Sequence, residues 1–414
     1  MAFPRPAWLD GFDLRALPPD FVANPYPYYH ALREHDPLRR MPDGSVLLTR
    51  YEDCVAVYKD PLSYSSDKHA EFFPKFGPSP LYEHHTTSLV FNDPPLHTRV
   101  RRLIIGALTP RAVEAMTPGL EQLVQTLLDR LEDKARTGQP IDLIEDYAAA
   151  IPVEIIGNLL AVPREERGPL RAWSLAILGA LEPAPTAEQL ERGNRAVTDF
   201  LAYLRTLVAR RRAAPGDPAT DVLTRLIVGE GEERLTETEL LHNCIFLLNA
   251  GHETTTNLIG NALALFCEYR FAREALRATP SLIGHAVEEC LRYESSNQLG
   301  NRITTREVTL GGVTLPAQTR ITLVIGAANR DPAQFPDPDR FDIQREPNRH
   351  LAFATGPHLC AGHALARLEG RIAIGRFLER FPRYEIDLAA AERSRRVRFR
   401  GWVRLPAKLH ASAA

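Results

Sequence analysis

Apolar residues recur at helical spacing over three long stretches of the chain. The spacing predicts helices over 112–136, 187–212 and 236–266, and a shorter one over 281–294. In the first of these, one face carries a continuous aliphatic stripe, made of Leu120, Leu123, Val124, Leu127, Leu128 and Leu131. Helices should therefore form most of the fold.

The helix that begins at Thr236 is unusual in length and in polarity. Thr236 and Glu239 have the spacing of a capping box, in which two side chains satisfy free backbone donors of the first turn. The pattern continues far beyond the roughly 11 residues of an average helix. From Cys244 to Gly251 it is apolar on nearly every side, so we expect this helix to cross the interior.

Few segments have the alternation that is typical of strands. One covers 46–49, and 308–310 and 313–315 flank a Gly-Gly hairpin signal, with 321–325 predicted to join that hairpin. The segment 396–403 alternates arginines with apolar residues and is predicted to be a strand with one charged face, rather than an RNA-binding tract. The fold class is therefore mainly α with a small β-rich region.

Composition adds limits rather than a function. The net charge of -2 gives no reason to expect a nucleic acid or an anionic membrane as partner. No stretch approaches the roughly 18 apolar residues of a membrane span, and no apolar run near the start could serve as a signal peptide. We expect one cytoplasmic domain over 1–414, with the first 20 or so residues less tightly ordered.

The five cysteines do not form a pattern of disulfides or of a zinc site. They are widely spaced, and no Cys-x-x-Cys pair exists, which argues against a zinc ribbon, a redox dithiol and c-type haem attachment. His84, His85 and His97 could suggest zinc, but adjacent side chains diverge and no further ligand stands at a suitable spacing, so we expect loop histidines.

One cysteine stands in a chemically distinctive turn. Cys360 lies directly before a helix pattern with Leu365, Leu368 and Ile372 on one face, so free amides and the helix dipole would stabilise its thiolate. Gly356 permits close backbone approach in this turn. The surrounding sequence is Phe353-Ala-Thr-Gly356-Pro-His358-Leu-Cys360-Ala-Gly362.

This segment resembles the haem-binding pattern of the cytochrome P-450 family, Phe-Gly-x-Gly-x-His-x-Cys-x-Gly, with Ala354 in place of the first glycine. The resemblance extends over roughly 24–405 and implies the cytochrome P-450 fold. In that fold, haem b lies between the long central helix and the helix that follows the cysteine, which ligates the iron. A thiolate ligand donates electron density that favours O–O cleavage. If position 354 needs a positive φ, alanine there costs on the order of 1 kcal/mol.

Further motifs of the family occur in its order. Ala250-Gly251-His252-Glu253-Thr254 lies within the long helix; the resemblance implies that Ala250 and Gly251 make room for a ligand and that Glu253 and Thr254 manage protons for bound oxygen. Glu289 and Arg292, joined by Arg340 of a Pro-x-Arg-Phe segment, match a structural triad that supports the haem loop. The implied contacts of the haem propionates are His97, Arg101, Arg302 and His358.

The resemblance implies a monooxygenase that receives its electrons from outside, because the chain has no flavin, nicotinamide or iron–sulfur fingerprint. We expect a ferredoxin and its reductase as donors, docking near Cys360 on a basic patch of Arg99, Arg102, Arg349 and Arg367. The substrate is expected to be small and largely apolar. The candidate substrate contacts are Phe72, Phe73, Leu89, Leu248, Asn297, Leu299 and Trp402.

Two alternatives remain open at this point. A haem-thiolate sensor would bind haem without turnover, and a peroxide-using enzyme would need no external electrons. The Glu253–Thr254 pair favours the reductive pathway over both: a sensor needs no proton relay, and members of the family that use or rearrange a peroxide often lack this acid–alcohol pair.

Overall fold

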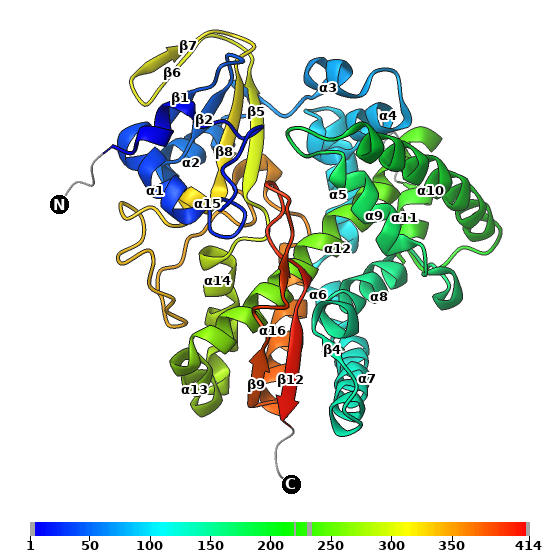
Figure 1. Ribbon diagram of the computed structural model, residues 1–414. Helices are drawn as coiled ribbons and strands as arrows, with labels where there is room; N and C mark the ends of the chain where they lie inside the picture. The colour runs from blue at the N-terminus through cyan, green and yellow to red at the C-terminus, as the bar shows by residue number, and fades with distance from the viewer. Residues whose placement is uncertain (1–4, 219–220, 230–233, 411–414) are drawn as a thin grey trace. The chain divides into compact units, whose positions relative to one another are not determined.

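Helices dominate the computed structural model, which describes residues 5–218, 221–229 and 234–410 (Figure 1). Contacts between residues divide the chain into two units, each made of separate segments. The first comprises Met1–Ser66, Gly260–Cys360 and Ile386–Leu405, and the second comprises Asp67–Ile259, Ala361–Glu385 and Pro406–Ala414. That the chain is a single domain stays a prediction.

The first unit is built around a five-stranded sheet. Its strand order is β1 (Leu38–Arg40), β2 (Val46–Leu48), β8 (Arg320–Val324), β5 (Leu299–Thr304) and β3 (Tyr64–Ser65). Only the β2–β8 pair is parallel among these strands. Alternate residues of β2 enter two different apolar clusters, Val46 and Leu48 on one face and Leu47 on the other. The sheet is therefore covered on both faces.

Short helices and two small hairpins complete the first unit. The helices are α1 (Tyr26–His35), α2 (Tyr51–Lys59), α13 (Arg270–Ala278), α14 (Ile283–Tyr293) and α15 (Ile325–Ala328), with the 3-10 turns η1 (Ala7–Gly11), η6 (Pro280–Leu282) and η7 (Gly356–His358). The hairpins pair β6 (Val308–Leu310) with β7 (Val313–Leu315), and β10 (Glu392–Arg393) with β11 (Trp402–Arg404). Leu9 and Phe12 are buried, so this part of the N-terminal segment is packed rather than loose.

The second unit is almost entirely helical. Its helices are α3 (His69–Phe76), α4 (Pro80–Thr87), α5 (Leu96–Ala107), α6 (Pro110–Glu114), α7 (Thr117–Arg136), α8 (Ala150–Leu159), α9 (Leu170–Gly179), α10 (Ala187–Ala213), α11 (Val222–Val228) and α16 (His363–Arg380). It also contains the short turns η2 (Leu89–Phe91), η3 (Ile144–Ala148) and η4 (Arg164–Glu166). The strands β4 (Ile141–Asp142), β12 (Pro406–His410) and β9 (Arg383–Ile386) pair in that order.

The longest helix, α12 (Glu237–Glu268), belongs to both units, with its residues up to Ile259 in the second. It begins as predicted. The backbone N–H of Glu239 donates to the Thr236 hydroxyl at 3.2 Å, and the N–H of Thr236 donates to the Glu239 carboxylate at 2.8 Å. Within the described ranges, no helix combines the length and the apolarity that crossing a membrane requires.

Three predicted elements differ from the structure. The helix over 112–136 is divided into α6 and α7 near Ala115, because Pro118 in the first turn of α7 cannot continue a preceding helix. Strand 321–325, seen as β8, pairs with β2 and β5 and not with the Gly-Gly hairpin. Of the strand predicted over 396–403 only β11 forms.

The reason for the third difference is the direction of Arg400. Its guanidinium is buried and donates to the carbonyls of Val22 and Ala23 at 2.8 and 3.0 Å, and it is ion-paired with Glu294. An arginine that is bound in this way cannot belong to a charged face exposed to solvent, so the prediction of such a face for this segment is wrong.

Candidate functional site

Cys360 ends the loop of the first unit that contains η7, directly before the residues that lead into α16. The backbone N–H of Cys360 donates to the carbonyl of Phe353 at 2.9 Å, and that of Leu359 donates to Gly356 at 3.0 Å. These bonds close the loop on itself and leave the Cys360 side chain exposed. The thiol is thus presented at the surface of its unit on a hydrogen-bonded turn.

Two backbone positions explain the residue choice in this loop. Gly356 has φ of 74°, and a Cβ there would lie 2.4 Å from the carbonyl oxygen of Tyr58, so only glycine fits. Ala354 also has a positive φ, of 56°, which is the condition under which the alanine is strained. Gly362 has an ordinary φ of -90° and needs no such freedom.

The other cysteines differ from Cys360 in exposure. Cys54, Cys244 and Cys290 are buried, and Cys267 is half-buried. Burial raises the pKa of the Cys244 thiol to about 12 and also raises the pKa of Cys54 and Cys290. Because a metal-binding thiol must be deprotonated, these three are poor ligands by comparison with Cys360.

A narrow accessible stripe runs along the otherwise buried middle of α12. Ala250 is exposed, and Leu247, Gly251 and Thr254 are partly exposed, whereas Leu248, Asn249, His252 and Glu253 are buried. Positions 247, 250, 251 and 254 share one helix face. Ala250 is therefore the open position on this interior helix, whereas the space beside Gly251 is filled by Ile156 of α8, whose Cδ1 would lie 2.5 Å from a Cβ at 251. That this face bears a ligand stays a prediction.

The hydroxyl of Thr254 donates back to the carbonyl of Ala250 at 2.8 Å, within the same face. The next residue, Thr255, turns to the opposite side and donates to the carboxyl of Glu369 on α16 at 3.4 Å. Glu369 is buried, and burial raises its pKa to about 8. Sequence reasoning missed Glu369, although a glutamate on the apolar stripe with Leu365, Leu368 and Ile372 was a visible signal.

The candidate propionate contacts are placed as follows. His97 and Arg101 lie one turn apart on α5, His97 buried and Arg101 partly exposed. In the first unit, the buried guanidinium of Arg302 lies 5.0 Å from the centre of the Tyr58 ring and donates to the carbonyl of Asn301 at 2.7 Å. His358 is the last residue of η7 and is partly exposed.

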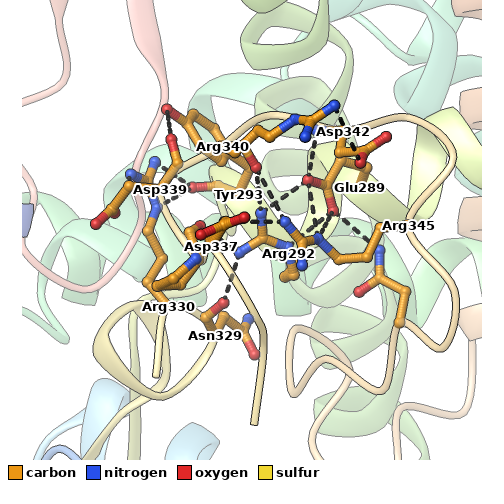
Figure 2. A network of polar contacts seen from close by, with 12 residues as sticks. Glu289, Arg292, Tyr293, Asn329, Arg330, Asp337, Asp339, Arg340, Asp342 and Arg345 are labelled. Carbon is orange, nitrogen blue, oxygen red and sulfur yellow. Dashed lines mark hydrogen bonds and ion pairs between the residues drawn. The ribbon is translucent and has the colours of Figure 1, made fainter. Parts of the chain in front are cut away.

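Glu289 and Arg292 form a fully buried, bidentate ion pair with distances of 2.7 and 2.8 Å (Figure 2). The third arginine is Arg345, whose Nε lies 3.4 Å from the Glu289 carboxylate, with a side chain 9% exposed. The Arg340 side chain is 66% exposed and faces Asp342 at 3.8 Å.

The assignment of the Arg340 side chain to this triad is therefore wrong. Its contribution is its carbonyl, which accepts from Arg292 at 3.1 Å and from Arg345 at 3.2 Å. The N–H of Asp342 and the amide of Asn348 also donate to Glu289, at 2.8 and 3.1 Å, so its carboxylate is enclosed by donors.

The candidate substrate contacts fall into two groups. Leu248 and Leu299 are 0% and 1% exposed, so neither offers surface to a ligand, and both assignments are corrected. On the open face of α12 the apolar side chain next to position 248 is Leu247, because position 248 itself is turned by about 100° from that face.

The remaining candidates are exposed to different degrees. Phe72 and Leu89 are buried, Phe73 is 53% exposed, and Asn297 and Trp402 are partly exposed. The ring of Phe73 packs edge-on against Tyr82 at 5.5 Å, and the Arg393 guanidinium covers Trp402 at 3.6 Å.

His84 and His85 are not loop residues as predicted. Both lie on α4 and are buried, because α4 packs its last turn into the interior of the second unit. In the described part of the chain, no group of three or more His, Cys, Asp or Glu side chains is arranged to hold a metal ion.

Comparison with known proteins gives a consistent result. The sequence profile described as cytochrome P-450 matches residues 281–390. The chain is 36% identical over 376 residues to the biotin biosynthesis cytochrome P-450 of Bacillus subtilis, covering 88% of this chain and 90% of that one. It is 39% identical over 373 residues to the vitamin D(3) 25-hydroxylase of Pseudonocardia autotrophica, covering 89% of each.

Solved structures agree with this result. The crystal structure of cytochrome P-450 BioI in complex with an acyl carrier protein ligated to hexadec-9Z-enoic acid aligns with a TM-score of 0.84 and 35% identity. The alignment covers 94% of this chain and 99% of that one.

Proposed function

This chain belongs to the cytochrome P-450 family and is a haem-dependent monooxygenase, and from that premise we propose that Cys360 is the thiolate ligand of its iron. Haem b is the cofactor and dioxygen the co-substrate. When bound, haem supplies the iron at which dioxygen is activated by delivered electrons, so that one oxygen atom enters the substrate and the other leaves as water.

The observation that carries the proposal is the exposure of a single thiol. All five cysteines lie in the described part of the chain, and Cys360 alone is exposed. It stands where the free amides that lead into α16 lower the free energy of a thiolate. The open stripe on α12 fits haem as well, since the small Ala250 is exposed among buried residues of that helix.

We assign the propionates of haem to four cationic or donor side chains. His97 and Arg101 present two nitrogen groups on one face of α5, and Arg302 and His358 are the other two members of the set. Guanidinium and imidazole groups donate to carboxylates, which is the chemistry that the propionates would require. Phe353, Gly356 and Gly362 complete the loop that would pack on the ring.

Proton delivery is assigned to Glu253 and Thr254. Thr254 lies on the open stripe, where its hydroxyl can exchange the Ala250 carbonyl for a bound oxygen or water. Glu253 is buried on the adjacent side of the helix, so its carboxyl can carry protons toward Thr254 without exposing the face to bulk solvent.

The substrate class we propose is a small, largely apolar molecule with one or two polar groups, which is hydroxylated or otherwise oxygenated. Phe73 is 53% exposed and lies in the apolar and aromatic segment 69–91, which we assign to the substrate, and Asn297 and Trp402 add polar edges. The similar proteins named for vitamin D(3) and for a fatty acyl chain support an apolar substrate.

We further propose that a ferredoxin and its reductase deliver the electrons. We also propose that the protein acts in the cytoplasm, where reduced nicotinamide can supply that reductase. Of the predicted basic patch, Arg99 is ion-paired with Glu239, and Arg367 donates to His363 at 2.8 Å. Arg102 and Arg349 are exposed, so they are the cations we assign to docking.

The test is the ferrous–carbon monoxide difference spectrum of the purified protein. The wild type should give the strongly red-shifted Soret band of a thiolate ligand, and Cys360→Ser should lose it. Cys267→Ser, which changes a half-buried thiol, is the matched control and should keep the band. A red-shifted band in Cys360→Ser, or a histidine-type band in the wild type, would contradict the proposal.

A further inference from the structure

Polar side chains of α12 hold α4 and η2 in place. The Asn243 amide accepts from the N–H of Leu89 at 3.0 Å and donates to the carbonyl of Thr87 at 3.3 Å. Farther along the helix, the amide of Asn249 donates to the imidazole of His84 at 3.4 Å. All these side chains are buried, so breaking the contacts would leave polar groups without partners.

Three imidazole rings meet in this buried seam. His84 and His85 of α4 and His242 of α12 are each 2% exposed. The ring centre of His84 lies 4.9 Å from that of His85 and 5.6 Å from that of His242. Charges on neighbouring rings at these distances repel one another strongly in an interior of low dielectric constant.

Hydrogen bonds define which nitrogen of His84 carries its proton. The hydroxyl of Ser88 donates to the carbonyl of His84 at 2.6 Å, so its oxygen can only accept from the ring nitrogen Nδ1, 3.4 Å away. Nδ1 is therefore the protonated nitrogen, and Nε2 is left to accept from Asn249. With the Asn249 amide in this orientation the imidazole is neutral, since a proton on Nε2 would face the amide N–H.

The electrostatics of the seam agree with a neutral state. Burial first, and then His85 and His242, lower the pKa of His84 well below its usual value. Burial and the charge of Arg205 on α10 lower the pKa of His242 to about 4. The facing carboxylate is Glu83 of α4, 59% exposed and 3.9 Å from His242. Protonation from solvent therefore requires α4 to move.

The seam holds the segment to which substrate contacts are assigned. Phe72 of α3 packs edge-on against His85 at 5.7 Å and against Phe91 of η2 at 5.1 Å, and Leu89 is fixed by Asn243. Any separation of α4 from α12 would move Phe72 together with His85 and would act against the bond that holds Leu89 to Asn243 of α12. The position of α4 therefore determines which apolar surface a substrate meets.

We propose that His84, His242 and Asn249 form a histidine latch: they are positioning residues that hold α4 on α12 only while both imidazoles are neutral. The latch makes substrate selection pH-dependent. This rests on the proposed function in one respect, namely that segment 69–91 contacts the substrate. Lowering the pH opens the latch, because the undocked histidines ionise near their ordinary pKa of about 6.5 whereas the docked ones do not.

The experiment is hydrogen–deuterium exchange of the haem-loaded full chain at pH 7.5 and pH 5.5, corrected for the intrinsic pH dependence of exchange. Between pH 7.5 and pH 5.5, the equilibrium constant for opening of peptides within 80–91 should rise roughly tenfold for each histidine that ionises on opening. With His84 and His242 both ionising, the wild type should show a ratio of about a hundredfold. His84→Gln keeps a neutral acceptor for Asn249 but cannot ionise, so its ratio should fall to about tenfold.

His84→Gln combined with His242→Gln should remove nearly all of the pH response, whereas His285→Gln, at an exposed histidine of α14, should keep the wild-type ratio. A wild-type ratio below about twofold, or an unchanged ratio in His84→Gln, would overturn the latch. At pH 7.5 the single and the double glutamine variant should both keep α4 docked, because the latch is neutral at that pH. Rapid exchange throughout 80–91 in either variant at pH 7.5 would therefore also overturn the latch.

The same samples separate the latch from the proposed function. The carbon monoxide spectrum reports ligation by Cys360 and is independent of α4. If Cys360→Ser keeps the red-shifted band while the exchange ratios are as expected, the ligand assignment is wrong and the latch stands. If the spectrum is as expected but the exchange ratios are flat, the latch is wrong and the function stands.

Discussion

The hydroxyl of Thr254 is the polar group that the open stripe of α12 offers to a ligand. In the structure it is occupied by the Ala250 carbonyl, a bond that a helix gives up at little cost because the carbonyl also belongs to the helical ladder. Thr256 makes the same type of bond, to His252 at 3.0 Å, but on the buried side of the helix. The two threonines differ therefore mainly in the face they occupy.

We expect Thr254→Ala to reduce the yield of product per electron consumed by roughly tenfold or more, because proton transfer at the face is lost. Haem content and the carbon monoxide spectrum should not change. The measurement is oxygenated product against reduced nicotinamide consumed, for a substrate that the wild type oxygenates. Thr256→Ala is the control and should keep its coupling; full coupling in Thr254→Ala would contradict the relay role.

Glu369 is a buried carboxyl whose pKa is raised to about 8 by burial. A native pKa above the unfolded value means that the stability linked to this proton is complete below about pH 4.5 and is lost as pH rises toward 8. Glu369→Gln removes the ionisation. We expect its melting temperature to exceed that of the wild type at pH 8.5, with a much smaller difference at pH 5.

The difference in unfolding free energy between Glu369→Gln and the wild type should change by no more than about 1.4 kcal/mol per pH unit, which is the limit for one proton. The measurement is thermal unfolding of the variant and the wild type, followed at the haem absorption band at both pH values. Glu379→Gln, at an exposed position of the same helix, should show no pH-dependent gain. A stability difference for Glu369→Gln that is the same at both pH values would show that the carboxyl is not held neutral.

At the scale of elements, the Glu289–Arg292 pair joins α14 to the long loop before Cys360. Arg292 donates to the carbonyls of Asn329 at 3.0 Å and Pro338 at 2.7 Å, so one buried guanidinium ties three segments of the first unit together (Figure 2). Arg345 extends the network to the carbonyls of Pro336 and Asp337, at 2.7 and 3.1 Å. The loop is thus held both by hydrogen bonds from the two arginines to its backbone carbonyls and by the ion pairs with Glu289.

This network predicts unequal effects for the two arginines of the segment. Arg345→Met should cost about 2–4 kcal/mol, because it removes a cationic partner from the buried Glu289 carboxylate and donors from three backbone carbonyls. Arg340→Met, at an exposed side chain, should change stability by less than about 0.5 kcal/mol. Chemical denaturation of both variants measures the difference, and equal losses would restore Arg340 to the triad.

At the scale of the whole molecule, the charges nearly cancel, with 50 basic and 52 acidic residues. Attraction of an acidic electron donor must then come from a local arrangement of arginines rather than from net charge. Arg99 and Arg367 are held by side chains of their own fold. Arg102 and Arg349 are exposed to solvent, where a partner can approach them.

We expect Arg102→Glu and Arg349→Glu each to slow reduction by a ferredoxin severalfold at low salt and to weaken the dependence of that rate on ionic strength. The measurement is the reduction rate of the ferric protein over a range of salt concentrations. Arg136→Glu, at an exposed arginine of α7, is the control. Unchanged rates and unchanged salt dependence in both test variants would remove these arginines from the docking surface.

Local sequence patterns were sufficient to locate the elements with strong periodicity and the motifs with fixed spacing. The bounds of α10 and the capping box of α12 follow from local patterns, as does the turn that carries Cys360, because capping and helix propensity act over a few residues. The positive φ of Gly356 is local in the same way, whereas the exclusion of any Cβ at that position comes from the carbonyl of Tyr58, which is far away in sequence.

The pairing of polar groups, in contrast, depends on how distant segments pack. Arg345 rather than Arg340 reaches Glu289, Glu369 faces Thr255, and three histidines from two helices share one seam. None of these partners is near the other in sequence, apart from His84 and His85. The free energy of burying a charge or an imidazole depends on what lies across the interface, and local sequence carries no information about that partner.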